Sequence, residues 1–119
     1  MDIKKTIEQN AYSIKFAIED NNKVVAWAFL VVIQSDRHDE PFGLLENVYV
    51  EQEYRGKGLG TKLVNAVIAE AKKLPCYKLL AQCRYSKPEV HAMYERFGFV
   101  DHGKNFRMDL VESKAKQRD

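Results

Sequence analysis

Residues 44–60 read LLENVYVEQEYRGKGLG, an apolar run followed at once by a glycine-rich turn. The apolar and aromatic side chains of 44–50 predict a strand, and the amphipathic spacing after Gly60 predicts a helix. Glycines allow the backbone to turn tightly and let a ligand approach it. The first turn of a helix offers free amide N–H groups and the positive end of the helix dipole. The stretch therefore predicts an anion site suited to phosphate, to which Arg55 and Lys57 add positive charge.

The spacing of the glycines narrows the kind of phosphate ligand. Gly56, Gly58 and Gly60 follow the pattern G-x-G-x-G. This spacing matches neither the dinucleotide pattern G-x-G-x-x-G nor the nucleoside-triphosphate loop G-x-x-x-x-G-K-[ST]. It matches instead the pattern R-x-x-G-x-G, which begins at Arg55. A plain tight turn that holds no ligand is the alternative interpretation.

Hydrophobic periodicity predicts the elements on both sides of this stretch. Strands at 12–19 and 23–34 are expected to form a hairpin through the turn residues 20–22. An apolar stripe predicts a helix over 63–74, which Pro75 ends. The remaining predicted elements are strands at 77–83, from Phe99 and at 105–110, and a helix around 90–97 with a capping box at 86–89 and a C-terminal cap at Gly98.

The predicted order is β-β-β-α-β-α-β-β, which belongs to the α/β class, or to α+β in some schemes. The strand–helix–strand unit between residues 44 and 83 requires a parallel, right-handed connection. The hairpins at the two ends are antiparallel. We therefore expect a mixed, mostly antiparallel sheet with a parallel β-α-β core.

Composition limits the classes of protein to consider. The 119 residues are 45% hydrophobic and 30% charged, which predicts one soluble domain over 1–119. The net charge of +2 is too small for a nucleic-acid-binding face. An apolar run of about 20 residues, as a membrane helix needs, is absent, and the polar start MDIKKTIEQN does not resemble a signal peptide. A cytoplasmic location is expected, and Cys76 and Cys83 lack the spacing of metal ligands, so no metal is expected.

Two segments resemble motifs of the GNAT superfamily of N-acetyltransferases. Residues 44–60 look like its pyrophosphate-binding motif, and residues 92–99, AMYERFGF, resemble its downstream Y-E-x-x-G-F helix. Tyr94 follows Gly60 by about 34 residues, with a predicted helix and strand between them, as in the superfamily. The resemblance covers residues 44–110 and implies a GNAT-like fold whose parallel core binds acetyl-CoA. Within the superfamily, the chain looks most like amino-sugar-phosphate and diamine acetyltransferases.

The resemblance implies where acetyl-CoA is held. The strand before the glycine loop is expected to separate from its neighbour at a bulge, so that backbone groups of Val48, Tyr49 and Val50 pair with the pantetheine arm. Lys87 stands where many members have an asparagine that contacts coenzyme A. The pyrophosphate is expected at Arg55, Gly56, Lys57, Gly58, Leu59, Gly60 and Thr61.

The resemblance also implies two groups that handle protons. Tyr94 matches the tyrosine that acts as general acid toward the leaving thiol. A phenol with a pKa near 10 can do this within hydrogen-bond reach. Glu46 matches a glutamate that, in diamine acetyltransferases, is proposed to deprotonate the amine through water. The alternative for Tyr94 is a side chain that only packs on the apolar face of an amphipathic helix. The alternative for Glu46 is a carboxylate that only faces solvent.

The activity implied is direct transfer of an acetyl group from acetyl-CoA to a primary amine, of a small molecule or a protein, in a ternary complex. A non-catalytic acetyl-CoA-binding module that regulates a partner protein is the alternative. Only about ten residues precede the first predicted strand. We therefore expect an N-terminally shortened member of the superfamily, in which the wall around the acceptor site is reduced. We expect a homodimer, in which a second subunit completes that wall.

Overall fold

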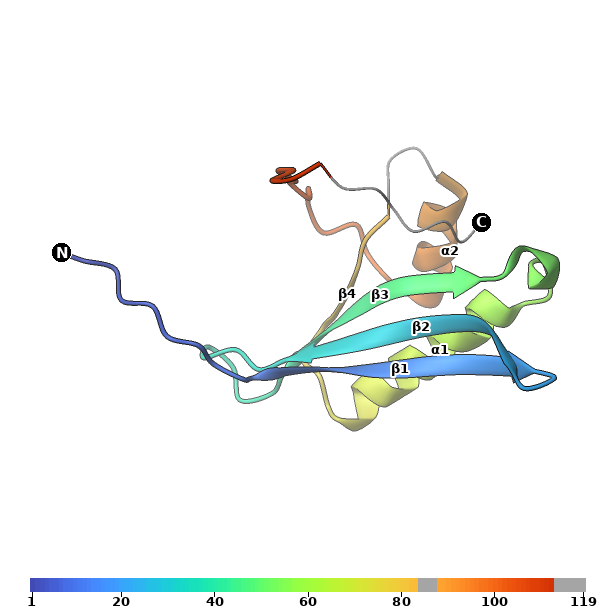
Figure 1. Cartoon of the computed structure of the whole chain (residues 1–119), viewed down its shortest axis with the longest axis horizontal. Helices are drawn as coiled ribbons and strands as arrows, with labels where there is room; N and C mark the ends of the chain where they lie inside the picture. The colour runs from blue at the N-terminus through green and yellow to red at the C-terminus, as the bar shows by residue number, and fades with distance from the viewer. Residues whose placement is uncertain (84–87, 113–119) are drawn as a thin grey trace.

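The computed structural model describes residues 1–83 and 88–112. Its elements are β1 (Ala11–Asp20), β2 (Lys23–Ile33), β3 (Phe42–Val50), the 3-10 turn η1 (Gln52–Tyr54), α1 (Leu59–Lys73), β4 (Leu79–Ala81) and α2 (Pro88–Phe97). The strands form one sheet in the order β1-β2-β3-β4 (Figure 1). β1, β2 and β3 are antiparallel, whereas β4 pairs parallel to β3. The predicted mixed sheet with a parallel core is confirmed.

β1 and β2 form the predicted hairpin through a two-residue turn. Asp20 pairs with Lys23, and Asn21 and Asn22 between them have positive φ angles of 51° and 63°. Positive φ at both central residues matches the twist of the flanking strands, and asparagine tolerates this conformation. Short-range chemistry therefore determines where the hairpin turns.

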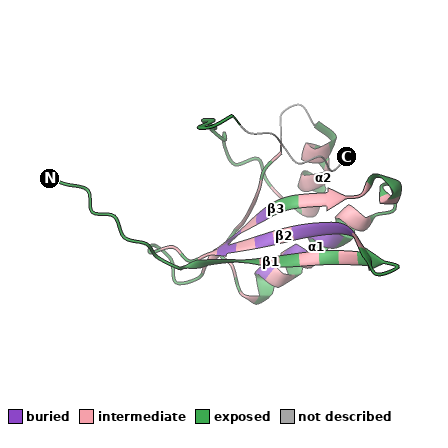
Figure 2. Ribbon diagram, in the orientation of Figure 1, coloured by how far each residue is buried: buried purple, intermediate pink, exposed green. Residues whose placement is uncertain are grey.

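The core lies between β2 and α1, as the purple residues of β2 in Figure 2 show. Alternate residues of β2 face the helix, and Leu30 has 0% of its surface exposed. α1 begins at Leu59, four residues before the predicted start, because the glycine loop leads directly into it. The buried residues of the cluster are Ala26, Ala28, Leu30, Val32, Leu45, Leu63, Val64, Val67 and Ala71.

The prediction of two further strands after α2 is wrong. Residues 99–112 form no strand, and Phe106, Met108 and Leu110 are at least 81% exposed. Alternating apolar side chains predict which residues suit a strand, but a strand forms only where its backbone finds an edge to pair with. β4 is also shorter than the predicted 77–83. The capping-box residue Ser86 lies outside the described residues.

Candidate functional site

A bulge in β3 marks the start of the site. Trp27 of β2 pairs with Tyr49, but Phe29 pairs with Glu46, so Asn47 and Val48 together lie opposite a single residue of β2. Asn47 has a φ of 52°, a left-handed conformation that asparagine adopts more readily than most residues. A bulge of this kind bends its strand and increases its twist. β3 therefore changes direction just before residues 48–50.

Beyond the bulge, β3 separates from β4. The parallel pairing joins Gly43–Leu45 to Leu79–Ala81 only, and Figure 1 shows the two strands diverging from there. The amide of Glu51 donates to the carbonyl of Val25 at 2.8 Å, toward β2. Because successive residues of a strand point their polar groups to opposite sides, Val50 directs its own N–H and C=O away from β2. Of the three residues 48–50, it is therefore Val50 whose polar groups lie on the open side of β3, and the carbonyl there accepts from the side chain of Arg55.

The glycine loop connects η1 to α1 at the end of β3. Gly56 and Gly58 have φ angles of 79° and 81°, which explains why glycine stands at both positions. A Cβ at either position would meet nothing within 4 Å, so the loop borders open space. The first amides of α1 have no partner within the helix, and its first turn contains no acidic residue. These features fit the diphosphate of acetyl-CoA.

Arg55 attaches the loop to the end of β3. Its Nε donates to the carbonyl of Val50 at 2.8 Å, and its guanidinium carbon lies 5.5 Å from the ring centroid of Tyr49. The Tyr49 ring in turn lies 4.8 Å from the ring of Trp27. The Tyr49 hydroxyl is buried and finds no hydrogen-bond partner among the described residues. Arg55 therefore orders the loop in addition to bringing positive charge to it.

Tyr94 lies half-buried on α2, with its ring centroid 5.4 Å from that of Phe99. Burial raises the pKa of its phenol above the ordinary 10.0, and Cys83 and Glu46 raise it further. A phenol with a raised pKa stays protonated over a wider pH range. Tyr94 is therefore equipped to donate a proton, which is the role that the resemblance implies.

Among the described residues, Glu46 and Cys83 act electrostatically on Tyr94. Glu46 is exposed on β3 immediately before the bulge, so β3 and α2 place the two predicted proton-handling residues within electrostatic reach of each other. Cys83 is the last residue of the predicted strand 77–83, whereas in the structure it lies two residues after β4. Burial and the carboxylate of Asp101 raise the pKa of its thiol, which stays neutral at neutral pH. No sequence motif includes both Cys83 and Tyr94, so the sequence alone does not indicate that the thiol influences the phenol.

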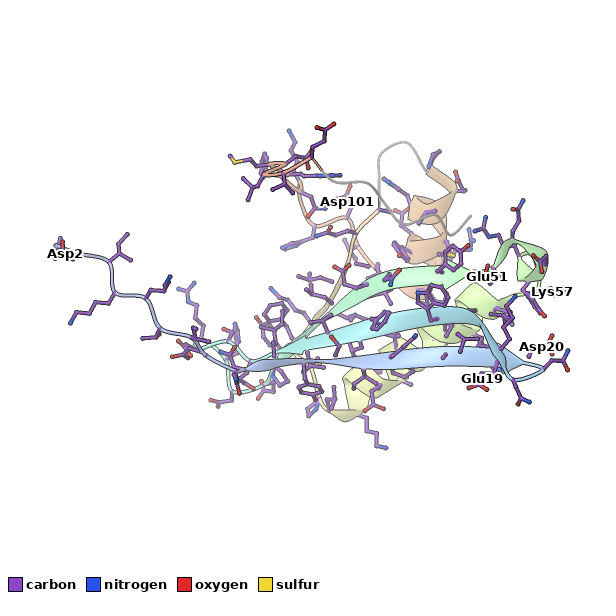
Figure 3. All side chains as sticks on the ribbon, viewed as in Figure 1. Asp2, Glu19, Asp20, Glu51, Lys57 and Asp101 are labelled. Atoms are coloured by element: carbon purple, nitrogen blue, oxygen red, sulfur yellow. The ribbon has the colours of Figure 1, made fainter. Side chains whose placement is uncertain are left out.

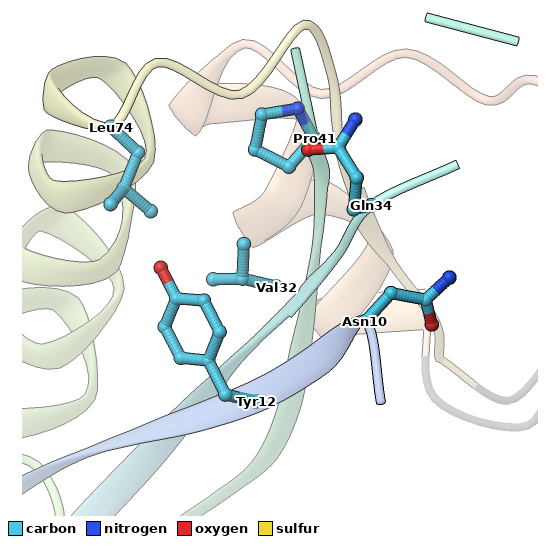
Figure 4. Close-up of a pocket in the computed structure, with 6 residues that line it drawn as sticks. All are labelled: Asn10, Tyr12, Val32, Gln34, Pro41 and Leu74. Carbon is cyan, nitrogen blue, oxygen red and sulfur yellow. The ribbon is translucent and has the colours of Figure 1, made fainter. Parts of the chain in front are cut away.

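Other features of the described residues lie apart from this site. A recess of about 200 Å³ is located at the end of the sheet remote from the glycine loop, and none of the predicted site residues lines it (Figure 4). Residues 1–83 and 88–112 contain no cluster of three or more potential metal ligands. No helix within the same ranges is long and apolar enough to cross a membrane. Lys87 lies outside the described residues.

The bulged strand and the glycine loop before a helix agree with a comparison against protein families. Residues 2–99 match the acetyltransferase (GNAT) family. The chain belongs to this family. The match includes both motifs and begins well before the first of them, so membership of the GNAT family rests on most of the chain.

Three proteins illustrate what this GNAT chain resembles. Glucosamine 6-phosphate N-acetyltransferase 1 of Oryza sativa subsp. japonica is 35% identical over 85 residues, 71% of this chain and 48% of the relative. Aminoglycoside N(6')-acetyltransferase type 1 of Stenotrophomonas maltophilia is 33% identical over 86 residues, 65% of this chain and 56% of the relative. The crystal structure of glucosamine-6-phosphate N-acetyltransferase from Arabidopsis thaliana shares the fold, with a TM-score of 0.74 at 22% identity over 83% of this chain and 67% of that one. The chain spans about half the length of the two curated relatives.

Proposed function

We propose that this GNAT chain transfers the acetyl group of acetyl-CoA directly to a primary amine of an amino sugar, in a ternary complex. The arrangement of the site supports this proposal most strongly. The open side of β3 runs from Glu46, which acts on Tyr94, to a glycine loop suited to a diphosphate. The acceptor class is supported by two relatives whose names refer to glucosamine 6-phosphate and aminoglycosides.

The residues of the loop and of β3 would divide the binding of acetyl-CoA between them. The amides around Gly58, Gly60 and Thr61 would hold the diphosphate, because they stand at the positive end of α1. The outward-facing N–H of Val50 would pair with the pantetheine arm, since its C=O accepts from Arg55. This division assigns binding mainly to backbone groups, so side-chain truncations there are expected to matter less than changes of charge or backbone conformation.

The transfer removes two protons from the amine nitrogen and delivers one to the departing sulfur. The amine nitrogen forms a bond to the thioester carbonyl carbon, and the bond from that carbon to sulfur breaks. Because an alkylamine has a pKa near 10.4, it must first lose a proton, which Glu46 would accept through water. Tyr94 would give its proton to the departing thiolate and regain one, through water, from the nitrogen, which loses its second proton as the amide forms. Glu46 would release the first proton to solvent. No covalent intermediate on the protein is needed.

The proposal is tested by measuring thiol release from acetyl-CoA in the presence of candidate amines. Glucosamine 6-phosphate, an aminoglycoside, spermidine and a peptide with a free amino terminus cover the main acceptor classes. We expect turnover with the amino sugars, and mass spectrometry of the product is expected to show one added acetyl group. Binding of acetyl-CoA without turnover of any amine would contradict the proposal and favour the non-catalytic regulatory module.

Replacing Glu46 with glutamine tests its role as the base. We expect kcat to fall about 10- to 100-fold at neutral pH and to recover as the pH rises, because more of the amine is then already deprotonated. Loss of the Glu46 charge also removes one cause of the raised pKa of Tyr94, so the alkaline limb of the profile moves to lower pH. A pH–rate profile like that of the wild type would show that a group other than Glu46 accepts the proton of the amine.

A homodimer is part of the proposal. The exposed, alternating apolar side chains of residues 105–110 support it, since such a segment suits pairing with another chain. Analytical ultracentrifugation at micromolar concentration is expected to show a dimer. A sedimentation coefficient that remains monomeric throughout this range would contradict the expectation.

A further inference from the structure

The turn before the glycine loop is attached to the tip of the β1–β2 hairpin. The Tyr54 hydroxyl, in η1, donates to Oδ2 of Asp20, the last residue of β1, at 2.6 Å. The two residues are 34 positions apart in the sequence. Figure 3 shows Asp20 at the hairpin tip, at the same end of the molecule as Lys57 of the loop. We call this hydrogen-bonded pair, Tyr54 and Asp20, the hairpin strap.

The hairpin presents Asp20 in a defined position. Asp20 pairs with Lys23 across the two-residue turn. The left-handed conformations of Asn21 and Asn22 close that turn with little freedom. The carboxylate therefore sits at the closed end of a hairpin, just beyond a shift in register between Ile18 and Glu19, whereas its partner belongs to an irregular connection.

Tyr54 connects the hairpin to the glycine loop. Its amide donates to the carbonyl of Glu51 at 2.9 Å, which closes η1. Its ring lies 5.3 Å from the Nζ of Lys57, the lysine between the two left-handed glycines. On the other flank, Arg55 attaches the loop to Val50. The loop is thus held from β3 by Arg55 and from the hairpin by Tyr54.

We propose that Tyr54 and Asp20 are positioning residues that hold the glycine loop in the conformation that receives the diphosphate of acetyl-CoA. This role rests on the proposed function. A loop with glycine at both Gly56 and Gly58 has many accessible conformations. Fixing one of them on binding costs conformational entropy and therefore weakens the affinity. A hydrogen bond that orders the loop beforehand lowers that loss. The strap touches neither the thioester nor the amine, so it acts on the binding of acetyl-CoA and not on the chemical step.

Tyr54→Phe separates these effects, because it removes the hydroxyl and keeps the ring for Lys57. We expect the Kd for coenzyme A, by calorimetry, and the KM for acetyl-CoA to rise on the order of three- to tenfold, while kcat stays unchanged. Tyr12→Phe, which removes a hydroxyl from the far end of β1, is the matched control and is expected to bind as the wild type does.

A pair of substitutions at Asp20 tests the hydrogen bond independently of charge. Asn and Ala remove the same negative charge, but only Asn keeps an oxygen that accepts from Tyr54. We expect Asp20→Asn to bind coenzyme A three- to tenfold more tightly than Asp20→Ala. Combining Asp20→Ala with Tyr54→Phe is expected to add little to either substitution, since both break the same bond.

Amide hydrogen exchange of residues 55–61 in the ligand-free chain reads the order of the loop directly. We expect faster exchange in Tyr54→Phe and Asp20→Ala than in wild type and Asp20→Asn. If wild type binds coenzyme A but Tyr54→Phe changes neither affinity nor exchange, the role of the strap is overturned and the proposed function stands. If wild type does not bind coenzyme A, the proposed function fails, and this role of the strap fails with it.

Discussion

Replacing Gly58 with aspartate is expected to abolish the binding of acetyl-CoA. Gly58 caps the N-terminus of α1, and a Cβ there would border open space. The carboxylate would project in front of the amides proposed to hold the diphosphate. Two like unit charges about 4 Å apart repel by about 4 kcal/mol near a protein surface, which weakens binding roughly a thousandfold. Calorimetric titration with coenzyme A measures the loss.

Gly58→Asn is the matched control for this substitution. Asparagine has the shape of aspartate without its charge, and both tolerate the left-handed conformation that Gly58 adopts. We expect Gly58→Asn to retain most of the affinity and both variants to unfold at similar temperatures. Equal affinities for wild type and Gly58→Asp would show that the glycine loop does not hold the diphosphate.

Replacing Tyr94 with phenylalanine is expected to lower kcat by about 100- to 1,000-fold, with little change in the KM for acetyl-CoA. The substitution removes the phenolic proton and keeps the ring that packs against Phe99. The fold should therefore survive, and circular dichroism with thermal unfolding checks that it does. Steady-state kinetics at saturating amine then report the chemical step.

The pH dependence of kcat provides a second readout for Tyr94. A general acid works only while it is protonated, so activity falls as the pH rises through its pKa. Because burial, Cys83 and Glu46 raise that pKa, the alkaline limb is expected above pH 10.0 in wild type. Cys83→Ala is the control for the neighbouring thiol and should keep kcat near that of wild type. Unchanged kcat in Tyr94→Phe would exclude the tyrosine as the acid.

The features that sequence analysis predicted correctly depend on interactions between near neighbours. Asn21 and Asn22 turn the hairpin because their side chains tolerate positive φ. Gly56 and Gly58 shape the loop because glycine also adopts positive φ readily. The apolar stripe of α1 follows from helical periodicity, although the helix starts earlier than the stripe indicates.

The prediction that failed depends on contacts between distant parts of the chain. Residues 105–110 have the alternation of a strand but remain exposed, since pairing needs a partner edge that the pattern does not specify. The length of β4 was overestimated for a related reason. Its residues pair only where β3 lies alongside, and β3 bends away at Asn47.

The sequence by itself therefore determined the mixed sheet, the glycine loop and the family motifs, because each is encoded by residues close together in the chain. The tertiary structure alone decided which groups meet. It set Glu46 and Cys83 within electrostatic reach of Tyr94 and joined Asp20 to Tyr54 across 34 positions. The conformational preferences of neighbouring residues cannot encode these long-range contacts, because the contacts depend on how the sheet twists, bulges and separates.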